Sequence, residues 1–231
     1  MTNKYVKAGI LIALLVVPAS VFIFLKVFGE NKFNLPYFMP VIQDNGEVLV
    51  SNGDTVFHQI PNFELINHDA VSINSNEFKD KICVVSFFFS RCGTVCPVIT
   101  RNQKAVQEEF KGNERVKIVS ISIDPKFDTP AVLKKYAQEN ELDLSQWHLL
   151  TGEKSYIYDL AIKGFKLPVA DASAYDSTIT NTDETFIHSE KLLLIDNLGF
   201  VRGIYDGTNK DELKRLNVEI KVLLEGFNDK E

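Results

Sequence analysis

Residues 82–97 read ICVVSFFFSRCGTVCP, and this stretch decides the fold. Its first nine residues, 82–90, form a short apolar run of β-branched and aromatic side chains. Such a run is typical of a strand that is buried on both faces, as in a parallel sheet covered by helices. The stretch therefore predicts a buried strand that leads through a loop, which carries two cysteines, into a helix over residues 97–110.

The same pattern of strands and helices continues along the chain. Thr129 and Pro130 suit the cap and the first position of a helix that runs to residue 140. Asn197, Leu198 and Gly199 are typical of a hairpin turn. Further strands are expected at 116–123, 147–150, 191–195 and 200–205, and further helices at 154–165 and 210–224. Strands that alternate with helices and end in a hairpin predict an α/β sandwich with a central mixed sheet.

The composition excludes some classes of protein. The chain has 231 residues, 45% of them hydrophobic and 24% charged, which is ordinary for a globular domain and argues against disorder. The net charge is −6 and no basic stripe is visible, so we expect no nucleic-acid partner. Three cysteines are too few for a disulfide scaffold.

An apolar segment near the start predicts export. Residues 8–25 (AGILIALLVVPASVFIFL) contain no charge and would span about 27 Å as a helix, which is close to the thickness of a membrane core. Lys4 and Lys7 precede it, which favours a cytoplasmic N-terminus. A cleaved signal peptide is the alternative, since Pro18-Ala19-Ser20 offers small residues, but the apolar run continues beyond that point. In both cases the rest of the chain is expected outside the cytoplasm.

These features give three segments. Residues 1–30 are expected to be a membrane anchor, and residues 31–54 a tether that contains several Pro and Gly residues. Residues 55–231 are expected to form one folded domain. That length is sufficient for a real hydrophobic core.

Cys92 and Cys96 are the strongest chemical signal. They follow a buried strand, and the loops after such strands commonly carry the sites of α/β proteins. A helix that begins near Cys92 would place both sulfurs on one face, and its N-terminus together with Arg91 would stabilise a thiolate. Two adjacent thiolates can form a disulfide or hold a soft metal ion. Buried structural cysteines or a structural disulfide remain alternatives, and Cys83, inside the strand, is expected in the core.

His188 is the candidate third ligand. It ends a polar loop directly before the apolar strand at 191–195, whereas His58, His68 and His148 have no comparable position. Two thiolates and an imidazole favour Cu(I) and permit Cu(II), and zinc could use the same set. Asp124 and Asp128 are interpreted as parts of a turn and a helix cap.

The polar loop at 167–187 has no lysine or arginine and contains four carboxylates. A loop of this length is commonly functional, and its charge would favour a basic face on a partner.

At this point the chain resembles the SCO/SenC family of copper chaperones. The resemblance rests on FFFS followed by Cys92-x-x-x-Cys96-Pro97, on ISIDPKFDTPAVLKKYA at 121–137, and on His188 before a strand and hairpin. It covers residues 61–224. It implies a thioredoxin-like fold, and it implies that Cys92, Cys96 and His188 match the copper ligands. Where the family often has Pro-Asp between the cysteines this chain has Gly-Thr, and Ile187 stands where an aspartate often precedes the histidine.

The resemblance also implies a function. The chain would be a metallochaperone rather than a turnover enzyme, binding copper and delivering it to the CuA-type site of cytochrome c oxidase subunit II or another copper-accepting protein. A donor chaperone would supply the copper, and the domain would face the periplasm from a single span in a bacterial inner membrane. An exported thiol–disulfide oxidoreductase is the alternative, with Cys92 and Cys96 as its redox pair. A peroxiredoxin is disfavoured because Phe89 stands where that family has a threonine.

Overall fold

The structure is a computed structural model, and it describes residues 4–28, 34–171, 186–187 and 190–228. The chain divides into two units, Met1–Asn34 and Leu35–Glu231, and each is described by itself.

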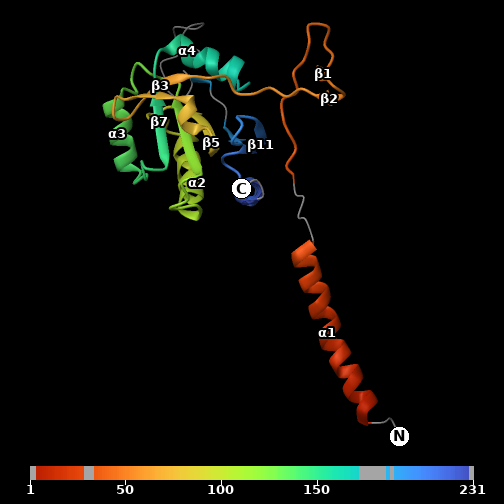
Figure 1. The fold of residues 1–231 in the computed structure, drawn as a ribbon. Coiled ribbons are helices and arrows are strands. Elements are labelled where there is room, and N and C mark those ends of the chain that lie inside the picture. Colours follow the sequence, from red (N-terminus) through yellow and green to blue (C-terminus); the bar gives the residue numbers. More distant parts are fainter. Residues whose placement is uncertain (1–3, 29–33, 172–185, 188–189, 229–231) are drawn as a thin grey trace. The chain divides into compact units, whose positions relative to one another are not determined.

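In the first unit the structure describes one helix, α1 (Lys4–Phe28), which includes the expected segment at 8–25 (Figure 1). It has Pro18 in its interior, and the stretch from Lys4 to Phe24 has a mean hydropathy of 2.4 and contains no buried residue. A helix of 25 residues is about 37 Å long at 1.5 Å per residue, which is enough to cross a hydrocarbon core. This helix fits a membrane anchor or a signal sequence.

The second unit is built on a seven-stranded mixed sheet in the order β11-β10-β5-β6-β7-β3-β4. The three central strands are parallel: β5 (Ile82–Phe88), β6 (Val116–Ser122) and β7 (Trp147–Thr151). The flanking strands join antiparallel: β3 (Glu64–Asn67), β4 (Ser72–Asn74), β10 (Lys191–Ile195) and β11 (Val201–Asp206). The predicted fold class is confirmed. The sequence did not predict β3 and β4, which are short and half polar.

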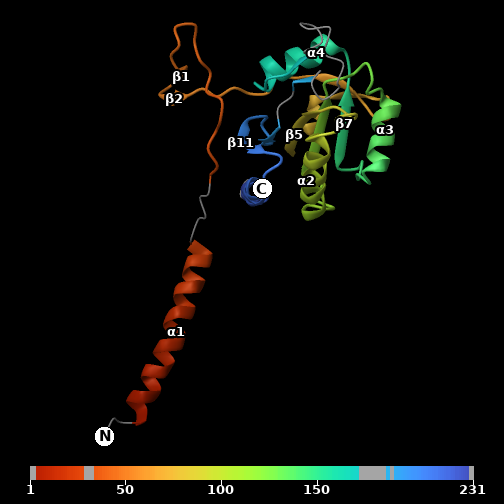
Figure 2. The ribbon, with the colours of Figure 1, turned by 180° about the vertical axis from the view of Figure 1, so that it is seen from behind.

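The helices lie close to the expected ranges. They are α2 (Cys96–Glu109), α3 (Pro130–Glu139), α4 (Lys154–Asp159) with the π-helical turn η2 (Leu160–Gly164), and α6 (Lys210–Asn228). A 3-10 turn, η1 (Ser75–Phe78), follows β4. Figures 1 and 2 show α2 along the sheet and α3 beside β7. Thr129 caps α3 as predicted, because its hydroxyl accepts a hydrogen bond from the Val132 amide (3.4 Å).

Strand β5 is the centre of the core, since all seven of its residues are buried. Side chains of a strand alternate between the two faces of the sheet. Ser86 therefore points to α2, where it bonds Gln103 (3.2 Å) and Ser120 (3.0 Å). The odd-numbered residues of β5 point to the other face, where the Phe87 ring packs against Phe165.

The segment before the sheet folds back onto it. The Phe38 amide donates to the Val201 carbonyl (2.9 Å), and the Arg202 guanidinium lies 4.0 Å from the centre of the Tyr37 ring. Arg202 is buried and pairs with buried Asp196 (2.9 Å). Further along the chain, before the first strand of the sheet, β1 (Val50–Ser51) and β2 (Asp54–Thr55) pair as a small antiparallel hairpin.

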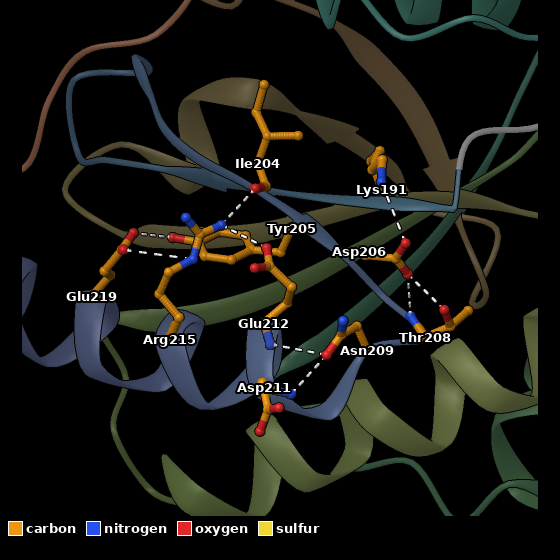
Figure 3. Close-up of polar contacts among 10 residues, drawn as sticks. All are labelled: Lys191, Ile204, Tyr205, Asp206, Thr208, Asn209, Asp211, Glu212, Arg215 and Glu219. Atoms are coloured by element: carbon orange, nitrogen blue, oxygen red, sulfur yellow. Dashed lines mark hydrogen bonds and ion pairs between the residues drawn. The ribbon is translucent and has the colours of Figure 1, made fainter.

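Helix α6 closes the domain against β11 (Figure 3). Asn209 caps it by accepting from the amides of Asp211 (2.9 Å) and Glu212. Tyr205 is buried under the Arg215 guanidinium, which lies 4.6 Å from the ring centre, and its hydroxyl donates to Glu219. Burial and this bond raise the pKa of Tyr205. The phenol therefore stays protonated and serves as a fixed donor.

Half-buried His148 on β7 leads to a prediction about pH. Burial, with smaller contributions from Lys117 and His68, lowers its pKa to about 4. Folding thus favours the neutral ring, so the stabilisation is complete above about pH 6.5 and is lost as the pH falls towards 4. We expect the urea midpoint of the full chain to drop between pH 7 and pH 4.5, and His148→Gln to make this drop smaller. An identical drop in both proteins would contradict the assignment.

Candidate metal site at the end of the central strand

The two cysteines lie at the carboxyl end of β5, on the connection to α2. Ser90 and Arg91 form a turn, Cys92 follows in the loop, and Cys96 is the first residue of the helix. The helix thus begins within one residue of the expected start at Pro97, because proline suits the first turn of a helix. Cys92 lies before this helix, so the two cysteines do not share one helical face.

The loop nevertheless brings the two thiols together. Both side chains are buried, with 6% of Cys92 and 2% of Cys96 exposed. A hydrogen bond between Cys96 and Cys92, in which the protonated Cys96 thiol is the donor, is the main reason why the pKa of Cys96 is raised, and burial raises it further. The Thr94 hydroxyl lies 3.6 Å from the Cys92 sulfur. The site is therefore a pair of adjoining cysteines in which Cys96 keeps its proton.

Arg91 connects two loops of the site. Its Nε and Nη2 atoms both lie 2.8 Å from Oδ2 of Asp124, at the end of the neighbouring strand β6. Its charge is thus paired with a carboxylate, and its guanidinium also lies 4.8 Å from the centre of the Phe127 ring. Arg91 ties the loop after β5 to the loop after β6.

Asp128 holds the same two loops from within. It is completely buried, and its carboxylate accepts from the Ser90 amide (3.0 Å) and from the hydroxyls of Ser90 and Ser122. Its negative charge is among the factors that raise the pKa of Cys96. The sequence pattern indicated that Asp124 and Asp128 are parts of a turn and a helix cap, and it did not predict that Asp128 joins the two loops. The available signal was that both aspartates follow the strand expected next to β5.

His188 lies outside the described residues, so its position relative to the cysteines is not tested. The chain on its C-terminal side is described. Strand β10 is antiparallel to β5 and begins at the edge of the sheet where β5 ends. The Gly207 amide donates to the Glu190 carbonyl (2.9 Å), and Asn102 of α2 donates to the Gly207 carbonyl (2.8 Å). Glu190, two positions after His188, is thus connected through Gly207 to α2, the helix that begins with Cys96.

The other candidate residues are placed elsewhere. His58 bonds the Gly164 carbonyl (2.7 Å), His68 is buried with Nε2 3.4 Å from Asp69, and His148 packs on Phe78. Cys83 is buried at the opposite end of β5 from the cysteine loop, as expected for a core residue, and burial raises its pKa to about 12. No group of three or more His, Cys, Asp or Glu side chains within the described ranges is placed to hold a metal ion.

Most of the acidic loop at 167–187 also lies outside the part of the chain that the structure describes. Its two ends pair in a short antiparallel ladder, β8 (Ala170–Asp171) with β9 (Phe186–Ile187). The sequence showed no strand period there, and a two-residue ladder is too short to produce one.

The buried carboxylate gives a prediction for the loop. Asp128→Ala would leave the amide and hydroxyl of Ser90 and the hydroxyl of Ser122 without their acceptor, at about 1–3 kcal/mol for each buried group. We expect a lower free energy of unfolding for this variant. We also expect faster alkylation of Cys92 and Cys96 in the folded full chain, with the rate measured by peptide mass spectrometry.

The matched control is Asp159→Ala, which removes an exposed carboxylate paired with Lys163. In this control, Cys92 and Cys96 should be alkylated at the wild-type rate. Equal rates in wild type and Asp128→Ala would show that Asp128 does not hold the loop.

The mixed sheet and the paired thiols after its central strand define a thioredoxin-like protein with a dicysteine site. The family model SCO1/SenC matches residues 53–222, and the chain belongs to this family.

Two kinds of relatives agree with this assignment. The "SCO1 protein homolog" of Bacillus subtilis (strain 168) is 29% identical over 160 residues, which cover 68% of this chain and 83% of the relative. A solved structure of BsSco, described as a member of the Sco family of cytochrome c oxidase assembly proteins with a disulfide switch, is 27% identical with a TM-score of 0.62, covering 72% of this chain and 93% of its own. Bradyrhizobium japonicum ScoI with copper bound shares the fold at 20% identity and a TM-score of 0.58, covering 71% and 98%.

Proposed function

We propose that this chain is a copper metallochaperone, which binds copper through Cys92, Cys96 and His188 and passes it to a copper-accepting protein. Membership of the SCO1/SenC family supports a copper-related function. The observation that carries the proposal is the pair of buried, adjoining thiols at the end of β5. Sulfur ligands of this kind are soft and favour Cu(I).

The binding step follows from the protonation state of the pair. When one Cu(I) ion enters, each thiol releases its proton to water and each sulfur donates an electron pair to the metal, without a change of oxidation state. The raised pKa of Cys96 makes loss of its proton unfavourable until the cation is present. Copper would supply a positive charge directly beside the two sulfurs.

We assign the third ligand to His188. The support is indirect: β10 starts at the edge where β5 ends, and Glu190 is tied through Gly207 to α2. A neutral imidazole adds no charge, so it strengthens binding without adding to the negative charge of two thiolates. It also gives the site a ligand that tolerates Cu(II).

The recipient is proposed to be subunit II of cytochrome c oxidase, at its CuA-type site. The description of BsSco as an oxidase assembly protein supports this choice. The acidic loop at 167–187 is proposed to dock on a basic face of the recipient. Transfer of Cu(I) from the cysteines of this chain to sulfur ligands of the recipient would need only the replacement of one set of ligands by another, without a change of oxidation state.

Copper binding gives the test of the site. The full chain in lipid nanodiscs should hold one Cu(I) in competition with a Cu(I) chelator, and Cys96→Ser should lose stable binding because one thiolate is gone. Cys83→Ser is the matched control and should bind normally, because Cys83 is at the other end of the strand. His188→Ala should weaken binding and change the Cu(II) absorption spectrum. Stoichiometric copper on Cys96→Ser would rule out this ligand set.

The contact between the sulfurs also supports thiol–disulfide exchange as a second function. Oxidation by a protein disulfide or by diamide would remove two protons and two electrons from Cys92 and Cys96 and join their sulfurs. We expect mass spectrometry to find this bond, and we expect the oxidised chain to bind no Cu(I) until dithiothreitol reduces it. A bond that involves Cys83 would contradict the layout.

Export is proposed as well, with α1 as a single uncleaved span of a bacterial inner membrane and the second unit in the periplasm. Lys4 and Lys7 before the apolar segment support this orientation. Alkaline phosphatase fused after Glu231 should therefore be active, and the chain should stay in the membrane at alkaline pH. Activity of a reporter that works only in the cytoplasm would refute the orientation, and release from the membrane would indicate cleavage.

A further inference from the structure

A hollow lies on the face of the sheet that is turned away from α2. It is a cavity of about 270 Å³. Its innermost residues are Cys83 and Val85 of β5 and Val119 of β6, all odd-numbered and thus opposite to Ser86 and Ser120. The hollow opens to solvent, and concave sites of this kind, lined largely by apolar side chains, are where small molecules commonly bind.

The roof of the cavity is a strap of the chain over residues 59–63, which is held at both ends. At one end Gln59 bonds the Leu198 carbonyl and the Ile60 amide bonds the Gly199 carbonyl (2.9 Å). At the other end Phe63 and Ser75 exchange hydrogen bonds of 3.1 and 2.8 Å. The backbone contacts hold the strap in place above the floor, and its side chains do not fill the space below.

The lining changes from apolar to polar towards the outside. The buried lining residues are apolar except for Asp196, whose carboxylate is paired with Arg202, and the rings of Phe63 and Phe165 stand among them. The exposed lining residues Lys79 and Asp80 mark the mouth. Their opposite charges are adjacent and largely offset each other, so the mouth does not select a strongly charged molecule. The apolar floor also offers water few hydrogen bonds, and poorly bound water is favourably displaced by an apolar group.

We propose that this cavity binds a small, uncharged amphiphile. Its apolar body would lie on Val85 and Val119, and its single polar group would stay at the mouth beside Lys79. An apolar cavity of about 150 Å³ accepts benzene. The present volume accordingly suits a body of two fused rings or an alkyl chain of similar size. The site is separate from the cysteine loop and does not depend on copper binding.

The probe for the test is 2-naphthol, and the protein is the full chain in lipid nanodiscs. Hydrogen–deuterium exchange with mass spectrometry should show slower exchange in the peptides that cover residues 59–63 and 79–85. Some amides in these peptides exchange only when the probe has left the cavity. At a probe concentration ten times the Kd, the exchange rate of those amides should fall about tenfold. Peptides of α3 should be unaffected.

Val85→Phe fills the cavity and should abolish this protection, while the urea midpoint stays at or above that of wild type because empty space is filled. Val218→Phe is the matched control: the same change at a valine that is 60% exposed should keep the protection. Cys83→Leu fills less space and serves as the second cavity variant if Val85→Phe is destabilised. No protection in wild type, or full protection in a folded cavity variant, would overturn the proposal.

Discussion

The parallel pairing of β5 with β6 is the constraint on which the rest of this domain depends. It runs in unbroken register from Ile82 opposite Val116 to Phe88 opposite Ser122. Because both strands end at the same edge, the loop with the cysteines and the loop with the two aspartates meet there. Arg91–Asp124 and the bonds to Asp128 then fix one loop against the other. The sheet thus determines where the thiols lie, and the polar contacts determine how firmly they are held.

This arrangement explains why Cys96 keeps its proton. Cys92 and Cys96 are both buried, they contact each other, and the negative charge of Asp128 adds to the factors that raise the pKa of Cys96. Each of these factors opposes a first thiolate, and a second thiolate would add repulsion. Under the proposed function, a soft cation bound to both sulfurs would offset these penalties.

The sequence predicted much of this, and its failures have physical causes. The apolar run of β5, the cap at Thr129 and the turn at Gly199 are local signals, and the structure has each of them. The pairing of Arg91 with Asp124 depends on contact between loops that are 33 residues apart in sequence. Strands β3 and β4 are held by their neighbours in the sheet rather than by their own pattern. The cavity, finally, exists because a distant strap fails to fill a space, and no local pattern encodes that.

The central claim is that the thiols of the cysteine loop, completed by His188, are the copper ligands. X-ray absorption at the copper edge of the Cu(I)-loaded full chain tests this most directly, because it counts the atoms bound to the metal. Two sulfur scatterers and one imidazole nitrogen are predicted, and His188→Ala should remove the imidazole signal while both sulfurs remain. A spectrum with no sulfur bound to copper, or an imidazole signal that persists in His188→Ala, would contradict the claim.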